Sequence, residues 1–173
     1  FLHPVTGQRQ HLCFTGGEPL MALAQTAIVG IYEELQKQNN LPGSMTFETN
    51  GTQKLRPQFI DWINSIDTEV FFSCSPKLFT VSGEKSMKAI KPEIVAEYRK
   101  LSDKGQLKFV VGPEDREWEE MESVIKQFKE EHKTKKVDFK MFTSSMKSIE
   151  ISANQSASAE DEANSLHGKY VIK

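Results

Sequence analysis

The segment CFTGGEPL, residues 13–20, marks the place where an apolar run ends in a glycine turn and a helical pattern begins. Gly16 and Gly17 have no Cβ atom, so a ligand or another backbone can approach this turn closely. Pro19 suits the first turn of a helix and disfavours a helical conformation for Glu18 before it. We therefore predict a strand, a tight turn and a helix start, with carbonyls and one carboxylate at the carboxyl end of the strand. Ligands bind at this end in open α/β sheets and in barrels, and such acceptors suit a cationic amine.

Outward from this turn, apolar strand patterns alternate with helical ones. The segment 21–38 is typical of a helix, since one face of its 3.6-residue period carries Ala24, Ile28, Ile31 and Leu35. The predicted strands are residues 11–15, 45–49, 69–74, 106–111 and 137–142, and the further helices are residues 57–66, 92–101 and 114–131. Strands that alternate with helices favour a parallel sheet with the helices outside it. Periodicity alone does not distinguish a curved barrel from a doubly wound sheet.

The segments between and after these elements are predicted as connections or short elements. Residues 79–91 form a long polar loop, of the kind that often serves as a lid or binding segment. Residues 132–136 form a solvated basic connector. In the tail we expect a short helix at residues 158–167, opened by a capping box, and a last strand at residues 170–172.

Length and composition favour one cytoplasmic domain without a nucleic-acid or membrane partner. The chain has 173 residues and a formal net charge of −2, which predicts no basic nucleic-acid or membrane patch. No apolar run reaches the length of a membrane span, and no signal peptide opens the chain. Cys13 and Cys74 lie in apolar runs, so we expect small buried hydrophobic residues in a reducing cytosol. The single predicted domain comprises a loop at 1–10, a β/α core at 11–142 and a divergent tail at 143–173.

Three short motifs together carry a family resemblance. TGGEPL at residues 15–20 is followed by ETNGT at 48–52 and SPK at 75–77. The first resembles the motif with which radical S-adenosylmethionine (SAM) enzymes hold the amino group of SAM. The order and distances of all three resemble the branch of 7-carboxy-7-deazaguanine synthases, over about residues 11–114. The resemblance implies an α/β fold of parallel (β/α) repeats, a partial TIM-type barrel of the radical SAM type, truncated at its N-terminus in this chain.

The resemblance also implies which residues bind. The glycine turn with Glu18 would hold the SAM amino group, the carboxylate and amide of the second motif would hold ribose hydroxyls, and Lys77 is a cation suited to a carboxylate. The implied SAM-binding residues are Gly16, Gly17, Glu18, Glu48, Asn50, Ser75, Pro76 and Lys77, and Thr15 is implied to face the substrate. These strand ends meet at one rim if the strands are parallel neighbours, which is the physical reason to treat them as one site.

The reaction implied by the resemblance converts 6-carboxy-5,6,7,8-tetrahydropterin to 7-carboxy-7-deazaguanine with loss of ammonia, in the biosynthesis of queuosine and other deazapurines. The implied cofactors are SAM, a 4Fe-4S cluster and Mg²⁺. The implied partners are the small pterin substrate, an electron donor such as flavodoxin and, in a homodimer, a second copy of the chain. We expect no direct contact with nucleic acid or a membrane.

The chain departs from the family pattern in its cysteines. A radical SAM cluster needs three closely spaced cysteines because thiolates hold the iron, whereas Cys13 and Cys74 stand about sixty residues apart with no third. We expect the cluster cysteines, and the residue of that loop that binds magnesium, upstream of Phe1, and we expect this chain alone to be inactive. Two alternatives stay open: another radical SAM enzyme of the glycyl-radical activase type, or a non-catalytic SAM- or pterin-binding remnant.

Overall fold

The fold is built on a parallel sheet whose strand order follows the chain. The computed structural model describes residues 3–137 and 139. Four strands lie in the order β1-β2-β3-β4, and every neighbouring pair is parallel. Their bounds are β1 His11–Phe14, β2 Ser44–Thr49, β3 Glu69–Cys74 and β4 Gly105–Leu107. The predicted α/β class with parallel repeats is therefore confirmed. The described strands form an open sheet, and the partial barrel stays a prediction.

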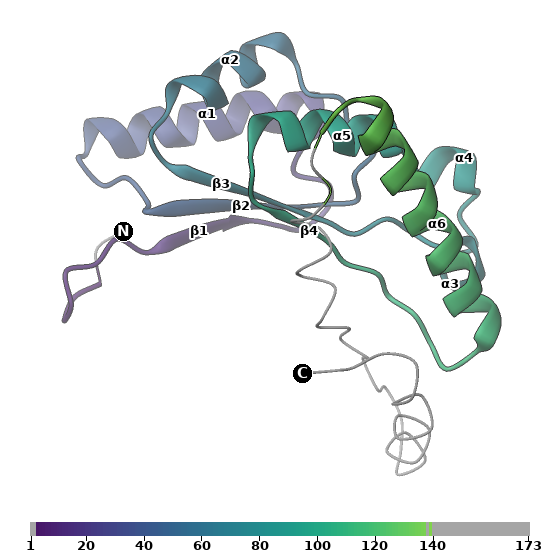
Figure 1. Cartoon of the computed structure of the whole chain (residues 1–173). Helices are drawn as coiled ribbons and strands as arrows, with labels where there is room; N and C mark the ends of the chain where they lie inside the picture. Colours follow the sequence, from purple (N-terminus) through teal and green to yellow (C-terminus); the bar gives the residue numbers. More distant parts are fainter. Residues whose placement is uncertain (1–2, 138, 140–173) are drawn as a thin grey trace.

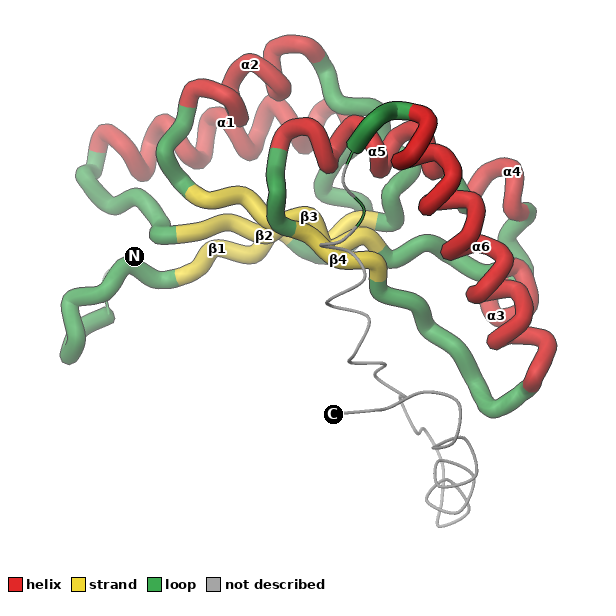
Figure 2. The backbone as a smooth tube through the Cα atoms, viewed as in Figure 1, coloured by secondary structure: helices red, strands yellow, loops and turns green. Residues whose placement is uncertain are grey.

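The helices gather on one side of this sheet. Figures 1 and 2 show α1, α2 and α5 together over one face, with α6 continuing the layer beyond β4 and with α3 and α4 beside it. Their bounds are α1 Ala22–Lys37, α2 Pro57–Ser65, α3 Phe79–Ser82, α4 Ser86–Ala89, α5 Pro92–Leu101 and α6 Asp115–Thr134. No described helix covers the opposite face of β1, β2 and β3, which we call the open face.

The core lies between the sheet and the helices and is rich in aromatic rings. Phe47 on β2 is fully buried, and its ring centroid lies 5.5 Å from Phe14 and Phe72 and 5.8 Å from Phe59 of α2. Phe72 stacks in turn on Tyr98 of α5 at 4.9 Å. Aromatic pairs at such distances add to the free energy gained by burying their area. One row of rings therefore joins three strands to two helices.

The buried face of α1 differs from the predicted one. Ile28 is buried as expected, but Ile31 is 47% exposed, and Gln25 and Tyr32 are buried instead. The reason lies in the hydrogen bonds of Gln25, whose amide donates to the carbonyls of Leu20 and Lys54 at 2.6 and 3.1 Å and accepts from the Arg56 N–H at 2.9 Å. A buried amide that satisfies three backbone groups stabilises the loop before α2. Because Gln25 must face the core to make these bonds, the face of α1 that carries Gln25, Ile28 and Tyr32 is buried and Ile31 is left exposed.

Several predicted boundaries were also wrong. The segment 79–91 is not one loop, because it contains α3 and α4, separated by Gly83 in a left-handed conformation (φ +70°). Residues 132–136 are not a solvated connector, because α6 continues to Thr134 and His132 is fully buried. The fourth strand is shorter than predicted. The predicted strand at 137–142, apart from residues 137 and 139, and the predicted tail elements lie outside the described residues.

The two cysteines lie in different environments, which corrects the prediction that both are buried. Cys74 is fully buried, but Cys13 is exposed. Cys13 pairs in register with Thr46 on β2 and alternates with Leu12 and Phe14, which pack against the core. Side chains alternate between the two faces of a strand, so Cys13 points to the open face, where no described helix covers it.

Candidate functional site

The glycine turn after β1 has the backbone conformation that only glycine adopts without strain. Gly16 has φ +84° and Gly17 has φ +57°, a region in which a Cβ atom crowds the backbone. A Cβ atom added at either position would meet nothing within 4 Å. The glycines are therefore required for conformation, and the turn presents its backbone to open space.

Glu18 holds this turn against the end of the second strand. Its Oε1 accepts hydrogen bonds from the Thr49 hydroxyl at 2.7 Å and from the Leu20 N–H at 3.0 Å, and its Oε2 accepts from the Asn50 N–H at 2.8 Å. Charge-assisted bonds of this kind are among the strongest in proteins. Three of the lone-pair positions of the carboxylate are thus occupied by the protein itself, and Glu18 positions the glycine turn.

The turn after β2 is tightly built as well. The Asn50 side-chain oxygen accepts from the Thr52 N–H at 2.9 Å and from the Thr52 hydroxyl at 2.6 Å, an Asx turn. Gly51 has φ +77°, and a Cβ atom there would lie 2.9 Å from Cγ2 of Val95. The side-chain oxygen of Asn50 is therefore held in place. The NH₂ group of the same side chain makes no hydrogen bond within residues 3–137 and can donate to a ligand.

The predicted site residues converge on one cavity at the carboxyl ends of the strands. It has a volume of about 370 Å³, within the range of small-molecule sites. Of the nine predicted residues, Glu18 and Pro76 do not line it; Glu18 has the role described above, and Pro76 is buried. The lining residues are Thr15, Gly16, Gly17, Glu48, Thr49, Asn50, Ser75, Lys77, Lys108 and Val110.

Three lining residues are not among the predicted site residues: Thr49, which lies within the second motif, and Lys108 and Val110, which lie outside all three motifs. Lys108 and Val110 lie just after the short β4. The Lys108 N–H donates a hydrogen bond to the Cys74 carbonyl at 2.7 Å. The Lys108 ammonium lies 3.4 Å from the Glu48 carboxylate. The sequence does contain a signal for Lys108, because it is the one charged residue in the apolar run LKFVV. A strand with one open face can present such a charged side chain to solvent.

The electrostatics of the cavity favour a ligand with an anionic group. Lys77 and Lys108 bring two positive charges, and Glu48 brings one negative charge. Cys13, next to the cavity on the open face, stays a thiol: partial burial and the neighbouring Glu48 carboxylate raise its pKa, and Lys108 offsets only part of this. A thiol with a raised pKa is a weak nucleophile and a weak metal ligand.

The described part of the chain does not fit an iron–sulfur cluster. Cys13 lies on the open face and Cys74 in the core under the helices, where burial raises its pKa strongly. Within residues 3–137 and 139, no group of three or more His, Cys, Asp or Glu side chains could hold a metal ion. These residues therefore supply no ligand set for the cluster.

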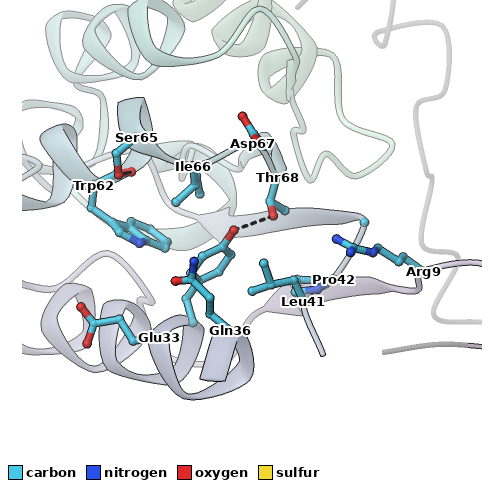
Figure 3. Close-up of a pocket in the computed structure, with 12 residues that line it drawn as sticks. Arg9, Glu33, Gln36, Leu41, Pro42, Trp62, Ser65, Ile66, Asp67 and Thr68 are labelled. Atoms are coloured by element: carbon cyan, nitrogen blue, oxygen red, sulfur yellow. Dashed lines mark hydrogen bonds between the residues drawn. The ribbon is translucent and has the colours of Figure 1, made fainter. Parts of the chain in front are cut away.

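A larger cavity, of about 630 Å³, lies at the opposite, amino-terminal ends of the strands (Figure 3). Trp62 and Tyr32 line it with edge-to-face rings 5.4 Å apart, and the Tyr32 hydroxyl bonds that of Thr68 at 2.8 Å. Arg9 lies on the opposite side of the cavity from Trp62 in Figure 3. None of the predicted site residues lines this cavity. Because the motifs converge elsewhere, the smaller cavity is the better candidate despite its size.

Comparison of the chain with protein-family models, with curated proteins and with solved structures returned no match in any of the three. Among the helices of the described residues, none combines the length and the apolar character that a membrane crossing requires.

Proposed function

We propose that this chain is the SAM-binding part of a radical SAM enzyme that resembles 7-carboxy-7-deazaguanine synthase. The observation that supports it is the convergence of three separate motifs, the glycine turn, Glu48 with Asn50, and Ser75 with Lys77, on one cavity at the carboxyl ends of parallel strands. The proposal includes a partial barrel for the whole protein, with the open face of the sheet as its interior.

The residues present fit SAM chemically. Gly16 and Gly17 line the cavity, where their backbone carbonyls would accept from an amino group. Lys77, which makes no ion pair within the described residues, suits the carboxylate, and the free amide of Asn50 suits a ribose hydroxyl. The bound SAM would supply radical chemistry to the site. The chain's own residues would bind and orient SAM and keep water from the site.

The proposed catalysis also needs iron ligands that the described residues do not supply. The described residues supply no ligand set for the cluster, so a complete enzyme needs cluster cysteines on another part of the polypeptide. With them, we propose conversion of 6-carboxy-5,6,7,8-tetrahydropterin to 7-carboxy-7-deazaguanine, with flavodoxin as electron donor, in the cytoplasm and as a homodimer. The separate positions of Cys13 and Cys74 favour one alternative for this chain alone, a SAM- or pterin-binding domain without catalysis.

Calorimetric titration of the 173-residue chain with S-adenosylhomocysteine tests the site itself. We expect binding that Lys77→Gln weakens and that Lys100→Gln, a control at an exposed ion pair with Glu97, leaves unchanged. No binding, or equal binding by both variants, would refute the site.

Iron and sulfide analysis of the native polypeptide, purified without oxygen, tests the catalytic proposal. About four irons per chain are expected for a 4Fe-4S enzyme, followed by 5′-deoxyadenosine and 7-carboxy-7-deazaguanine from the tetrahydropterin. S-adenosylhomocysteine binding without iron would instead support the non-catalytic alternative. Formation of 5′-deoxyadenosine without the ring-contracted product would support another radical SAM enzyme.

A further inference from the structure

The segment 77–91, which we call the basic segment, combines positive charge with exposed apolar side chains. It carries four lysines, Lys77, Lys85, Lys88 and Lys91, against one acidic residue, Glu84, whereas the whole chain has a formal net charge of −2. None of these lysines makes an ion pair within the described part of the chain. The segment therefore keeps an excess of positive charge over Glu84 and over the Glu120 carboxylate that binds its backbone.

Three large apolar side chains of the same segment are exposed. Met87 is 86% exposed and Phe79 is 54% exposed, and Val81 is exposed as well. Most large apolar side chains of the described residues lie in the core instead. Exposed apolar groups of this size mark protein interaction surfaces, in which aromatic residues and Met are enriched at the centre and polar residues form the rim.

The basic segment is held firmly, so these side chains are displayed by a fixed backbone. The Glu120 carboxylate of α6 accepts hydrogen bonds from the N–H groups of Phe79 and Thr80, each at 2.8 Å, and from the Thr80 hydroxyl at 2.6 Å. Leu78 at one end and Ile90 at the other are buried in the core. A surface fixed at both ends and on α6 loses little conformational entropy on binding.

The position of the basic segment places a docked partner at the candidate site. Lys77 begins the segment and also lines the cavity at the carboxyl ends of the strands. A protein that covered α3 and α4 would therefore lie against the rim of that cavity. Positive charge on one partner raises the association rate with an acidic one.

We propose that the basic segment is a docking surface for a small acidic protein. The partner is the acidic one-electron donor that a radical SAM reaction requires. This choice of partner rests on the proposed function. The apolar side chains contact the partner at the centre, and the lysines pair with acidic residues around it. Nucleic acid fits less well because the segment has no arginine and its most exposed apolar side chain, Met87, lies among the lysines.

Biolayer interferometry with purified flavodoxin on the immobilised 173-residue chain tests the surface. The variant Lys85→Glu/Lys88→Glu/Lys91→Glu should weaken binding by about tenfold or more at low salt, and less at high salt. The matched control Lys126→Glu/Lys133→Glu/Lys136→Glu makes the same charge change at exposed positions elsewhere and should keep the wild-type affinity within about twofold, allowing for long-range charge.

A second pair of variants tests the apolar contact. Phe79→Ser/Met87→Ser should weaken flavodoxin binding at both salt concentrations, whereas Val5→Ser/Leu23→Ser, which removes two exposed apolar side chains elsewhere, should not. Circular dichroism of each variant tests whether it keeps its fold. No flavodoxin binding by the wild-type chain, or equal loss in test and control variants, overturns the proposal.

Two other occupants are outcomes of the same experiment. Sedimentation that shows self-association of the chain, lost in the Phe79→Ser/Met87→Ser variant, would mean that a second copy covers the surface. Tighter binding of a single-stranded RNA oligonucleotide than of flavodoxin would mean a nucleic-acid site. Either result overturns the proposal.

The failure of this proposal is distinguishable from failure of the proposed function. Dithionite is a small reductant that needs no docking surface. Formation of 5′-deoxyadenosine by the native polypeptide with dithionite, together with unchanged flavodoxin binding in the lysine variant, overturns the docking surface alone. The absence of 5′-deoxyadenosine with dithionite would overturn the proposed function, while the binding data would still decide the surface.

Discussion

The Thr49 hydroxyl donates a 2.7 Å hydrogen bond to Oε1 of Glu18 and so connects the end of β2 to the glycine turn after β1. Thr49 is buried, and its oxygen also accepts from the Gly51 N–H at 3.1 Å. This one hydroxyl therefore serves both turns that border the candidate cavity.

Removal of that hydroxyl should be costly. We expect Thr49→Val to lower the free energy of unfolding by about 1–3 kcal/mol, because it leaves a buried N–H and a carboxylate with one partner fewer. In urea denaturation, Thr49→Val and Glu18→Gln should show a coupling energy of about 0.5–3 kcal/mol. Strict additivity of the two changes would contradict a direct link.

The glycine turns should differ in their tolerance of alanine. Gly17→Ala should cost about 1–2 kcal/mol, since its left-handed conformation is strained for alanine. Gly51→Ala should cost more, because the new Cβ atom also meets Cγ2 of Val95, and Val95→Ala should recover part of the loss. Gly30→Ala in α1 is the control and should stabilise by about 1 kcal/mol. Equal losses at Gly17 and Gly51 would contradict the contact with Val95.

Stability should fall as the pH drops from 7 towards 5 because of His132. Burial lowers the pKa of His132 below 6.5, against the opposing effect of its hydrogen bond with the Phe128 carbonyl; Arg99 lowers it further and Glu131 raises it. The unfolded chain then binds more protons than the folded one below pH 6.5, so unfolding becomes easier there. For one proton the slope has an upper limit of about 1.4 kcal/mol per pH unit.

Urea denaturation at pH 7.5, 6.5 and 5.5 measures this dependence. His132→Leu should flatten it, although the variant can also change the overall stability. The control His3→Gln alters an exposed histidine and should keep the wild-type slope. A slope in His132→Leu equal to that of the wild type would assign the effect to other groups.

Acid should also release α3. Burial alone would raise the pKa of Glu120, but the hydrogen bonds from Thr80 and Phe79 outweigh it and lower the pKa below 4.5. The stabilising effect of the ionised carboxylate is therefore present above pH 4.5 and is lost as the pH falls through the lowered value. The protection of residues 79–83 against hydrogen exchange, measured relative to the intrinsic rate at each pH, should fall below pH 4.5, and it should fall at neutral pH in Glu120→Gln. Glu119→Gln, at an exposed position, should leave exchange unchanged.

The two thiols should react at very different rates. In the native chain at pH 8, a disulfide reagent should modify the exposed Cys13 and leave the buried Cys74 unmodified. Mass spectrometry of the modified chain and of Cys13→Ser measures this. S-adenosylhomocysteine should slow the reaction, since Cys13 lies beside Glu48 of the cavity. Modification of Cys74 at a similar rate would mean that the core opens readily.

Much of the fold could be predicted because strand and helix periods are local properties. The strands at 45–49 and 69–74 agree with β2 and β3 almost to the residue. The errors arise where tertiary contacts decide. Cys13 lies in an apolar run, but the face it occupies has no described helix above it. Ile31 fits the helical stripe, but the polar contacts of Gln25 set the rotation of α1.

The candidate site was predictable to a similar degree. The motifs identified the residues that meet at the strand ends, because parallel neighbours bring their carboxyl ends to one edge. The sequence did not reveal that Glu18 is occupied by Thr49 and Asn50, since that depends on the distance between two turns. The sequence did not reveal Lys108 either, because β4 ends at Leu107, earlier than the apolar pattern indicates.

The agreement of strand order with chain order has a consequence for folding. Each described neighbour pair joins strands that are consecutive in sequence, so each new hydrogen-bonded ladder closes only the connection between two consecutive strands. Short closures cost less entropy than long ones, and β2 and β3 share the longest register. We therefore expect assembly to begin at the β2–α2–β3 unit, with β1 and β4 added on either side. Substitutions at Phe47 or Phe72 would then slow folding, whereas those at Leu107 would mainly speed unfolding.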